Sequence, residues 1–255
     1  MKRLVFTLPG VVLLLVCSCG IKLGYRHFAG PILPVGGGEA EQEYVVGDDR
    51  SITFLRDRLE VALVPLTAEV LNRQFAAEST TPKGFRQPNP HAIAHNPYTY
   101  GDWKPPGEEQ APERFTVFLL KVKNYAYPKV KIDPATITIT TPNGRRYQAI
   151  SLAALVEYYL PYAVAYAGNS RANVTSRRDL LRKTLYDAEF VFSGQEKEGY
   201  VVFPALDRDI ADFEVCIDEM KLRFDYKGEP VEKVDVSYKF RREIYMARRP
   251  RTDLR

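Results

Sequence analysis

The strongest constraint on the fold lies in residues 136–144. Residues 136–140 read Thr-Ile-Thr-Ile-Thr, a strict alternation of polar and apolar β-branched side chains that is typical of a half-buried strand. Asn143 and Gly144 follow, before a second strand-like run that begins at Arg145. An Asn-Gly pair between two such runs is a strong hairpin signal, because both residues tolerate positive φ in a two-residue turn. The sequence therefore predicts an antiparallel β structure with a tight hairpin at this point.

Strand patterns on both sides of the hairpin extend this prediction. Residues 115–124 are almost continuously apolar, which is typical of a central strand buried on both faces. Within residues 213–224 the apolar face changes phase near Asp218 and Glu219, and a β-bulge explains the change because one extra residue re-aims every later side chain. Further strands are expected at residues 51–65, 189–192, 199–206 and 231–245. The pattern predicts a mainly β protein, an antiparallel sandwich.

Two segments break the strand pattern with helical spacing. Residues 151–187 are predicted to be a helical insertion, in which Pro161 should kink or divide the first helix. A shorter helix is expected at residues 69–75, with Thr67 as its N-cap. In the insertion the apolar side chains that should face the sheet recur at intervals of three and four: Leu152, Leu155, Val156 and Tyr159.

A proline-rich loop is expected at residues 76–112, where seven prolines prevent regular backbone hydrogen bonding. His91 and His95 are four residues apart, the spacing that places two metal ligands on one helix face. Pro90 and Pro97 bracket them, so a helix there is not expected. We interpret both histidines as solvated loop residues and expect no metal and no other cofactor.

The N-terminus carries the most specific functional signal. Lys2 and Arg3 precede an apolar run at residues 11–16, which is too short to span a bilayer as a helix. The next residues are Cys-Ser-Cys-Gly, and this segment resembles the lipobox of exported bacterial lipoproteins, with Ser18 in the small position before Cys19. The resemblance implies that residues 1–18 are a removable signal peptide and that Cys19 is acylated with lipid such as palmitate, which would anchor the chain to a membrane.

Residues 19–50 are expected to form a flexible tether behind that lipid, because they are rich in glycine and proline. Gly20 takes the place where the family's inner-membrane proteins usually have aspartate. By that resemblance the outer membrane is favoured in a two-membrane cell, with the protein in the cell envelope on the periplasmic or surface side. The third cysteine, Cys216, then has no disulfide partner, and we expect it to have a structural role in a strand.

A second resemblance covers residues 113–242. The strand at residues 115–124, the Ile-Asp-Pro step at residues 132–134, and the Ser-Gly-Gln turn at residues 193–195 before Gly-Tyr-Val-Val-Phe resemble the immunoglobulin-like sandwich of exported bacterial lipoproteins. The resemblance implies no catalytic residues. We therefore expect a sandwich domain at residues 51–245, followed by a basic tail.

The basic tail covers residues 246–255, and its arginines could contact anionic lipid headgroups or an acidic partner, or could simply be solvated. Two arginines just before residue 246 are expected to act with this tail, which gives six basic residues: Arg241, Arg242, Arg248, Arg249, Arg251 and Arg255. Over the whole chain the formal charge is only +4, and it falls to +2 once Lys2 and Arg3 leave with the signal peptide. This balance argues against a dedicated nucleic-acid binder.

Tyrosines at intervals of four, Tyr158, Tyr162 and Tyr166, are the candidate partner-binding residues, because tyrosine is enriched in interfaces. Packing in the core is the alternative role for this stripe. No Gly-x-Ser-x-Gly elbow or phosphate-binding glycine loop is present, so we do not expect an enzyme. The expected function is that of a non-enzymatic binding or assembly module for another envelope protein. The alternative is a lipoprotein that binds a small ligand or a polysaccharide between the proline-rich loop and the tyrosines.

Overall fold

The computed structural model describes residues 25–37, 41–80, 95–105, 111–164 and 170–248. The protein is mainly β, with 45% of the described residues in strands and 20% in helices. The strands of the described residues are β1 (Tyr25–Ala29), β2 (Leu33–Gly37), β3 (Tyr44–Val46), β4 (Ile52–Arg56), β5 (Leu59–Leu66), β6 (Phe115–Asn124), β7 (Lys129–Lys131), β8 (Ile137–Thr140), β9 (Arg146–Gln148), β10 (Phe190–Phe192), β11 (Gln195–Pro204), β12 (Asp212–Phe224), β13 (Pro230–Arg241) and β14 (Ile244–Arg248). The α-helices are α1 (Ala68–Gln74), α2 (Ala76–Ser79), α4 (Leu152–Val164) and α5 (Ser170–Thr184).

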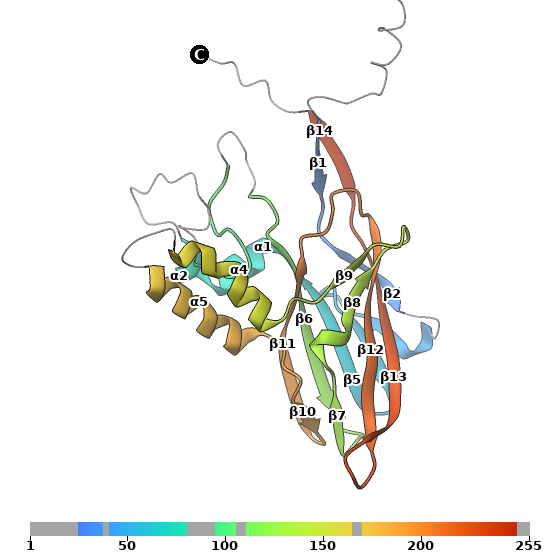
Figure 1. The fold of residues 1–255 in the computed structure, drawn as a ribbon. Coiled ribbons are helices and arrows are strands. Elements are labelled where there is room, and N and C mark those ends of the chain that lie inside the picture. The colour runs from blue at the N-terminus through green and yellow to red at the C-terminus, as the bar shows by residue number, and fades with distance from the viewer. Residues whose placement is uncertain (1–24, 38–40, 81–94, 106–110, 165–169, 249–255) are drawn as a thin grey trace, which may run out of the picture.

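Two antiparallel sheets form the body of the molecule (Figure 1). One sheet has the strand order β11-β6-β5-β4-β3, and the other has the order β10-β7-β12-β13-β2, with β8 paired to β12 and β9 to β8. Alternate side chains of both sheets form the main core, as expected where period-two apolar faces meet. At its centre Phe118 packs edge-to-face against Phe203, and Tyr238 donates a hydrogen bond of 2.9 Å to the carbonyl of Val61. A separate ribbon, β1 with β14, extends from one end of the sandwich.

A helical layer covers the outer face of the five-stranded sheet (Figure 1). Side chains of α1, α4 and α5 pack there against β6 and β11, and they form a second hydrophobic core. This is why residues 115–118 of β6 are buried on both faces, as the apolar sequence predicted, whereas Lys121 and Lys123 in its second half are partly exposed. Thr67 caps α1 as expected, since its hydroxyl accepts a bond from the backbone N–H of Val70. Helix α4 continues through Pro161, so this proline does not divide the helix.

The predicted hairpin is present as β8 and β9, but its turn is of a different type. Gly144 has a φ of 81°, whereas Asn143 is not among the residues with positive φ. The N–H of Gly144 bonds to the carbonyl of Thr141, and the N–H of Thr141 bonds to the carbonyl of Arg145. This is a three-residue loop built on a type I turn, which requires positive φ only at its glycine. Pro142 fits its first central position, since proline has the φ that this position needs.

The predicted bulge in β12 is confirmed. Its pairing with β13 shifts between Ile217 and Met220, and Glu219 has a φ of 55°. On the other side of β12, the partner strand changes from β8 at Ile217 to β7 at Lys221. The bulge therefore lies where one neighbour ends and the next begins, and it keeps Met220 in the core.

The prediction of a flexible tether over residues 19–50 is wrong for much of that segment. Residues 25–29 form β1, residues 33–37 pair with β13, and residues 44–46 pair with β4. Glycine and proline suit the edges of sheets as well as coils, and composition does not reveal a distant partner strand. Residues 19–24 lie outside the described residues.

Two strands expected as continuous are each divided. The run at residues 51–65 is a hairpin of β4 and β5, which turns at Asp57 with a φ of 57°. The run at residues 231–245 ends as β13 at Arg241, and the chain then leaves the sheet to form β14. In both places three consecutive charged residues, 56–58 and 241–243, interrupt the apolar alternation, and the expectation of continuous strands overlooked this signal.

Candidate functional site

Helix α4 buries one face and exposes the other. Leu155 is fully buried and Tyr159 is 1% exposed, both facing β6 and β11 as predicted. Tyr158 is 37% exposed, and Ala154 and Pro161 are exposed on the same side of the helix. The stripe predicted at Tyr158, Tyr162 and Tyr166 is thus seen in part. Tyr166 and the side chain of Tyr162 lie outside the described residues.

A buried arginine supports Tyr158 from below. Arg114 is 6% exposed, and its guanidinium donates hydrogen bonds to the carbonyls of Asn96 and Thr99 at 3.4 and 3.0 Å. Its guanidinium carbon lies 5.6 Å from the ring centroid of Tyr158 and 4.8 Å from that of Tyr159. Such cation–π contacts are strongest where water is excluded, so they help to hold a charge at this depth.

A second buried arginine reaches the same cluster from α5. Arg177 is 3% exposed, and its guanidinium carbon lies 4.9 Å from the ring centroid of Tyr159. Burial lowers the pKa of Arg177, and the charge of Arg114 lowers it further. Two arginines therefore contact the ring of Tyr159, Arg114 from the residue before β6 and Arg177 from α5. The hydroxyl of Tyr159 donates a 2.7 Å hydrogen bond to the carbonyl of Pro97. Four separate parts of the chain are tied together at this ring.

The phenols of this cluster are suited to packing and hydrogen bonding rather than to acid–base chemistry. Burial raises the pKa of both Tyr98 and Tyr159 well above the ordinary tyrosine value. Both side chains are therefore neutral donors at physiological pH, and neither can act as a base there.

The ring of Tyr158 is fixed on its inner side. It packs edge-to-face against Phe115 and Tyr159, with centroid distances of 5.3 and 5.0 Å. An aromatic side chain that is already held in place loses little conformational entropy when a partner covers it. The geometry is that of a preorganised contact residue.

Sequence reasoning missed Arg114, Arg177 and Tyr98 as members of this cluster. Arginine before a strand or within a helix is usually a surface residue, and only the tertiary structure brings tyrosine rings over it. The carbonyls that bind Arg114 come from the proline-rich loop, which we predicted to be irregular over residues 76–112. That prediction is wrong for residues 76–79, which form α2, and residues 96–99 are buried, with Asn96 at 0% and Tyr98 at 1% exposure.

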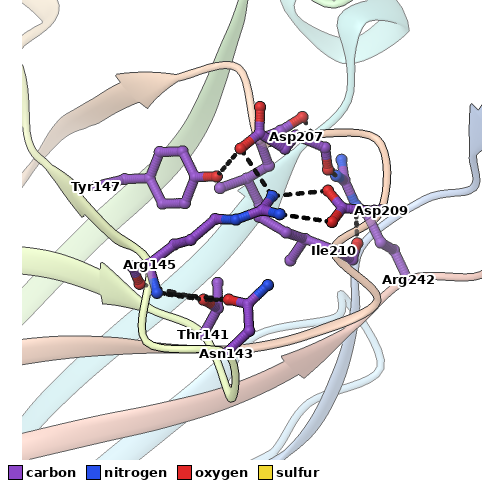
Figure 2. A network of polar contacts seen from close by, with 9 residues as sticks. Thr141, Asn143, Arg145, Tyr147, Asp207, Asp209, Ile210 and Arg242 are labelled. Carbon is purple, nitrogen blue, oxygen red and sulfur yellow. Dashed lines mark hydrogen bonds and ion pairs between the residues drawn. The ribbon is translucent and has the colours of Figure 1, made fainter.

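A polar network at the β8–β9 hairpin is the second candidate site (Figure 2). Arg145 makes a bidentate pair with Asp209 at 2.8 and 2.7 Å, and it contacts Asp207 at 2.9 Å. Tyr147 donates a 2.7 Å bond to the same oxygen of Asp207. The bonds from Arg145 lower the pKa of Asp209. The carboxylate of Asp209 is therefore held ionised, and the donors fixed on both aspartates lock the hairpin to residues 207–209.

Arg242 lies behind this network, and its placement corrects the prediction that it belongs to a basic surface tail (Figure 2). It is 2% exposed and donates to the carbonyls of Leu206, Asp207 and Ile210. A fourth contact joins it to the partly exposed Glu113 at 3.3 Å. Arg242 therefore fastens the end of β13 to residues 206–210. Arg241 points outward and pairs with Asp212.

Residues 246–248 of the predicted tail belong to β14, and residues 249–255 lie outside the described residues. His95 is half-buried rather than solvated, and burial lowers its pKa. His91 lies outside the described residues. No three His, Cys, Asp or Glu side chains of the described part of the chain lie close enough together to hold a metal ion.

Cys216 is a half-buried free thiol in β12. Its sulfur lies 3.7 Å from the hydroxyl of Thr140. Burial raises the pKa of this thiol, with smaller contributions from Asp218 and Glu214. A raised pKa disfavours the reactive thiolate, so the position suits packing better than chemistry.

Of the helices in the described residues, none combines the length and the apolar character needed to cross a membrane. Comparison of the chain with protein-family models, with curated proteins and with solved structures gives no match in any of the three.

Proposed function

We propose that the chain is a lipid-anchored protein of the cell envelope that works as a non-enzymatic binding or assembly module for another envelope protein. The lipid on Cys19 is the anchor, and the exposed side of α4 around Tyr158 is the contact surface. The observation that carries the proposal is the rigid, partly exposed ring of Tyr158 above a buried arginine and tyrosine cluster.

The sandwich is of the immunoglobulin-like type, and α4 and α5 are an insertion in it. Both helices lie between β9 and β10 in the chain. They pack on the outer face of the five-stranded sheet, and none of their described side chains belongs to the core between the sheets. An element that the main core does not need is available for recognition.

The short distance in sequence between Cys19 and β1 indicates which end of the molecule would face the membrane. Cys19 precedes Tyr25, the first residue of β1, by only six positions. Six residues span at most about 20 Å, so the β1–β14 ribbon would lie close to the bilayer. Tyr25 is opposite Arg248 in that ribbon, which places the start of the basic tail beside the same surface. The tail's arginines then meet anionic headgroups.

Two measurements test the anchor. Cys19→Ala should abolish acylation and release the protein from membranes, because no helix of the described residues can span them. Metabolic labelling with a fatty acid, followed by fractionation after a salt wash, checks both effects. Retention of the unacylated variant at the wild-type level would contradict a lipid anchor.

Partner capture tests the surface on α4. Tyr158→Ala should weaken binding of the partner by about 2 kcal/mol, the cost typical of a central aromatic contact. The matched control is Tyr226→Ala, because Tyr226 is 91% exposed in the β12–β13 turn. The protein that co-purifies with wild type from detergent-solubilised membranes should be lost with Tyr158→Ala and kept with Tyr226→Ala. Equal capture by both folded variants would refute the role of Tyr158.

A further inference from the structure

The outer face of the seven-stranded sheet carries a row of lysines across three strands. Lys131 in β7 lies directly opposite Lys221 in β12, and Lys221 lies directly opposite Lys233 in β13. We call these three residues the lysine row. They point away from the core, because the residues that alternate with the first two are fully buried: Val130, Ile132, Met220 and Leu222.

Aromatic rings continue the lysine row toward the sheet edge. Phe190 in β10 is opposite Lys131, and Phe192 is opposite Lys129. The ammonium of Lys129 lies 4.7 Å from the ring centroid of Phe190 and 4.5 Å from that of Phe224. Phe192 is 50% exposed. Cations and aromatic faces therefore alternate over one continuous surface.

The positive charge of this surface is only partly neutralised. Lys233 pairs with Glu219 at 3.0 Å, whereas Lys131 and Lys221 have no carboxylate oxygen within 4.0 Å among the described residues. Like charges directly opposite each other destabilise a sheet. The two lysine pairs in this row create a region of positive potential, and a bound anion would reduce the repulsion between them.

A hollow of about 500 Å³ adjoins the row at the end of the sheet. Lys129, Arg223 and Phe224 line it together with Tyr127 and Asp57. Asp57 accepts a 3.0 Å hydrogen bond from the hydroxyl of Tyr127, and Arg223 pairs with Glu232 at 3.1 Å. The hollow repeats the chemistry of the row, with aromatic walls and cations at its rim.

We propose that this face binds an acidic polysaccharide that carries a carboxylate on each sugar ring. Adjacent strands are about 4.8 Å apart, so the lysine row offers charges at a spacing comparable with the length of one sugar ring. Phe190 and Phe192 provide flat apolar surfaces for the faces of those rings. A polymer of acidic sugars matches the alternation of cation and aromatic ring, because each sugar offers both a carboxylate and an apolar ring face.

A membrane fits this face less well than a glycan. The β7 and β10 end of the sheet and the β12–β13 turn lie opposite the β1–β14 ribbon (Figure 1). If Cys19 carries the lipid anchor, the β1–β14 ribbon is the end that faces the membrane, and the lysine row faces away from it. Only this argument against a membrane as the ligand rests on the proposed function. Binding of the polysaccharide itself is independent of Cys19 and of the partner on α4.

Oligomers of galacturonic acid are the probe, and their methyl esters are the neutral control with the same backbone. The purified protein should bind the acid form by calorimetry, with an affinity that falls as salt is raised, and should not bind the ester. Lys131→Gln with Lys221→Gln should weaken binding about tenfold, or about 1.4 kcal/mol, within the sum expected for two surface ion pairs. Phe192→Ala should also weaken it.

Lys104→Gln with Lys183→Gln is the matched control, since it removes two exposed charges outside the seven-stranded sheet and should leave binding unchanged. Absence of binding to the acid oligomers, equal binding of the ester, or equal loss in the control pair would overturn the proposal. So would tighter binding, through the same lysines, to oligothymidylate or to phosphatidylglycerol vesicles, which would identify a nucleic acid or a membrane as the ligand.

Discussion

Replacing Arg242 with methionine tests whether a buried arginine fastens the end of β13. Methionine keeps much of the length and the apolar stem but removes every donor. The carbonyls of Leu206 and Ile210 then lose their partner within the protein, whereas the carbonyl of Asp207 keeps the hydrogen bond from the backbone N–H of Ile210. A buried acceptor without a partner costs about 1 kcal/mol or more, so two of them should reduce the free energy of unfolding by about 2 kcal/mol. Glu113 adds little, because its side chain is 40% exposed.

Urea denaturation of the purified protein measures this loss directly. In a domain of this size, about 2 kcal/mol also lowers the melting temperature by about 4–8 °C. The neighbouring Arg241→Met is the control. Arg241 is 63% exposed and pairs with Asp212 on the surface, so its removal should cost less than about 1 kcal/mol. If both variants lose less than 1 kcal/mol, water replaces the guanidinium of Arg242 and the proposed fastening is refuted.

Three further predictions follow from single residues. Gly144→Val should lower the free energy of unfolding by about 1–2 kcal/mol because φ is 81° there, although a side chain meets no atom within 4 Å; an unchanged melting temperature would contradict this. In an alkaline titration followed by phenolate absorbance, Tyr98 and Tyr159 should stay neutral until unfolding, since burial raises the pKa of each. The unfolded chain loses these protons above about pH 10, so stability should fall as pH rises beyond that value; complete ionisation of the folded protein near pH 10 would disprove the burial argument. Cys216 should react with a thiol reagent at pH 8 more slowly than free cysteine and should accelerate in urea, because burial raises the pKa of its thiol; equal rates would exclude this.

Features that depend on near neighbours in the chain were predictable. The hairpin at Asn143 and Gly144, the bulge at Asp218 and Glu219, and the cap at Thr67 each follow from a few adjacent residues. Apolar periodicity likewise identified β6 and the buried side of α4. Period and turn chemistry are local properties, so the sequence carries them without reference to the rest of the fold.

Features that depend on distant partners were not predictable. β1 pairs with β14 across more than two hundred residues, and a glycine- and proline-rich segment does not show such a partner. Arg114 and Arg177 are buried because tyrosines from other segments surround them. From the sequence alone, an arginine at either position predicts an exposed side chain, because the aromatic rings that cover it come from distant segments.

The sequence by itself determined that this chain is β-rich, with a helical segment within residues 151–187, because those properties follow from the period of its side chains. Only the tertiary structure decided which surfaces result. Lys131, Lys221 and Lys233 come from three strands, and the order and register of those strands alone place them in one row. The register of each strand is set by burial of its apolar face in the core, and this register also fixes where the exposed side chains lie.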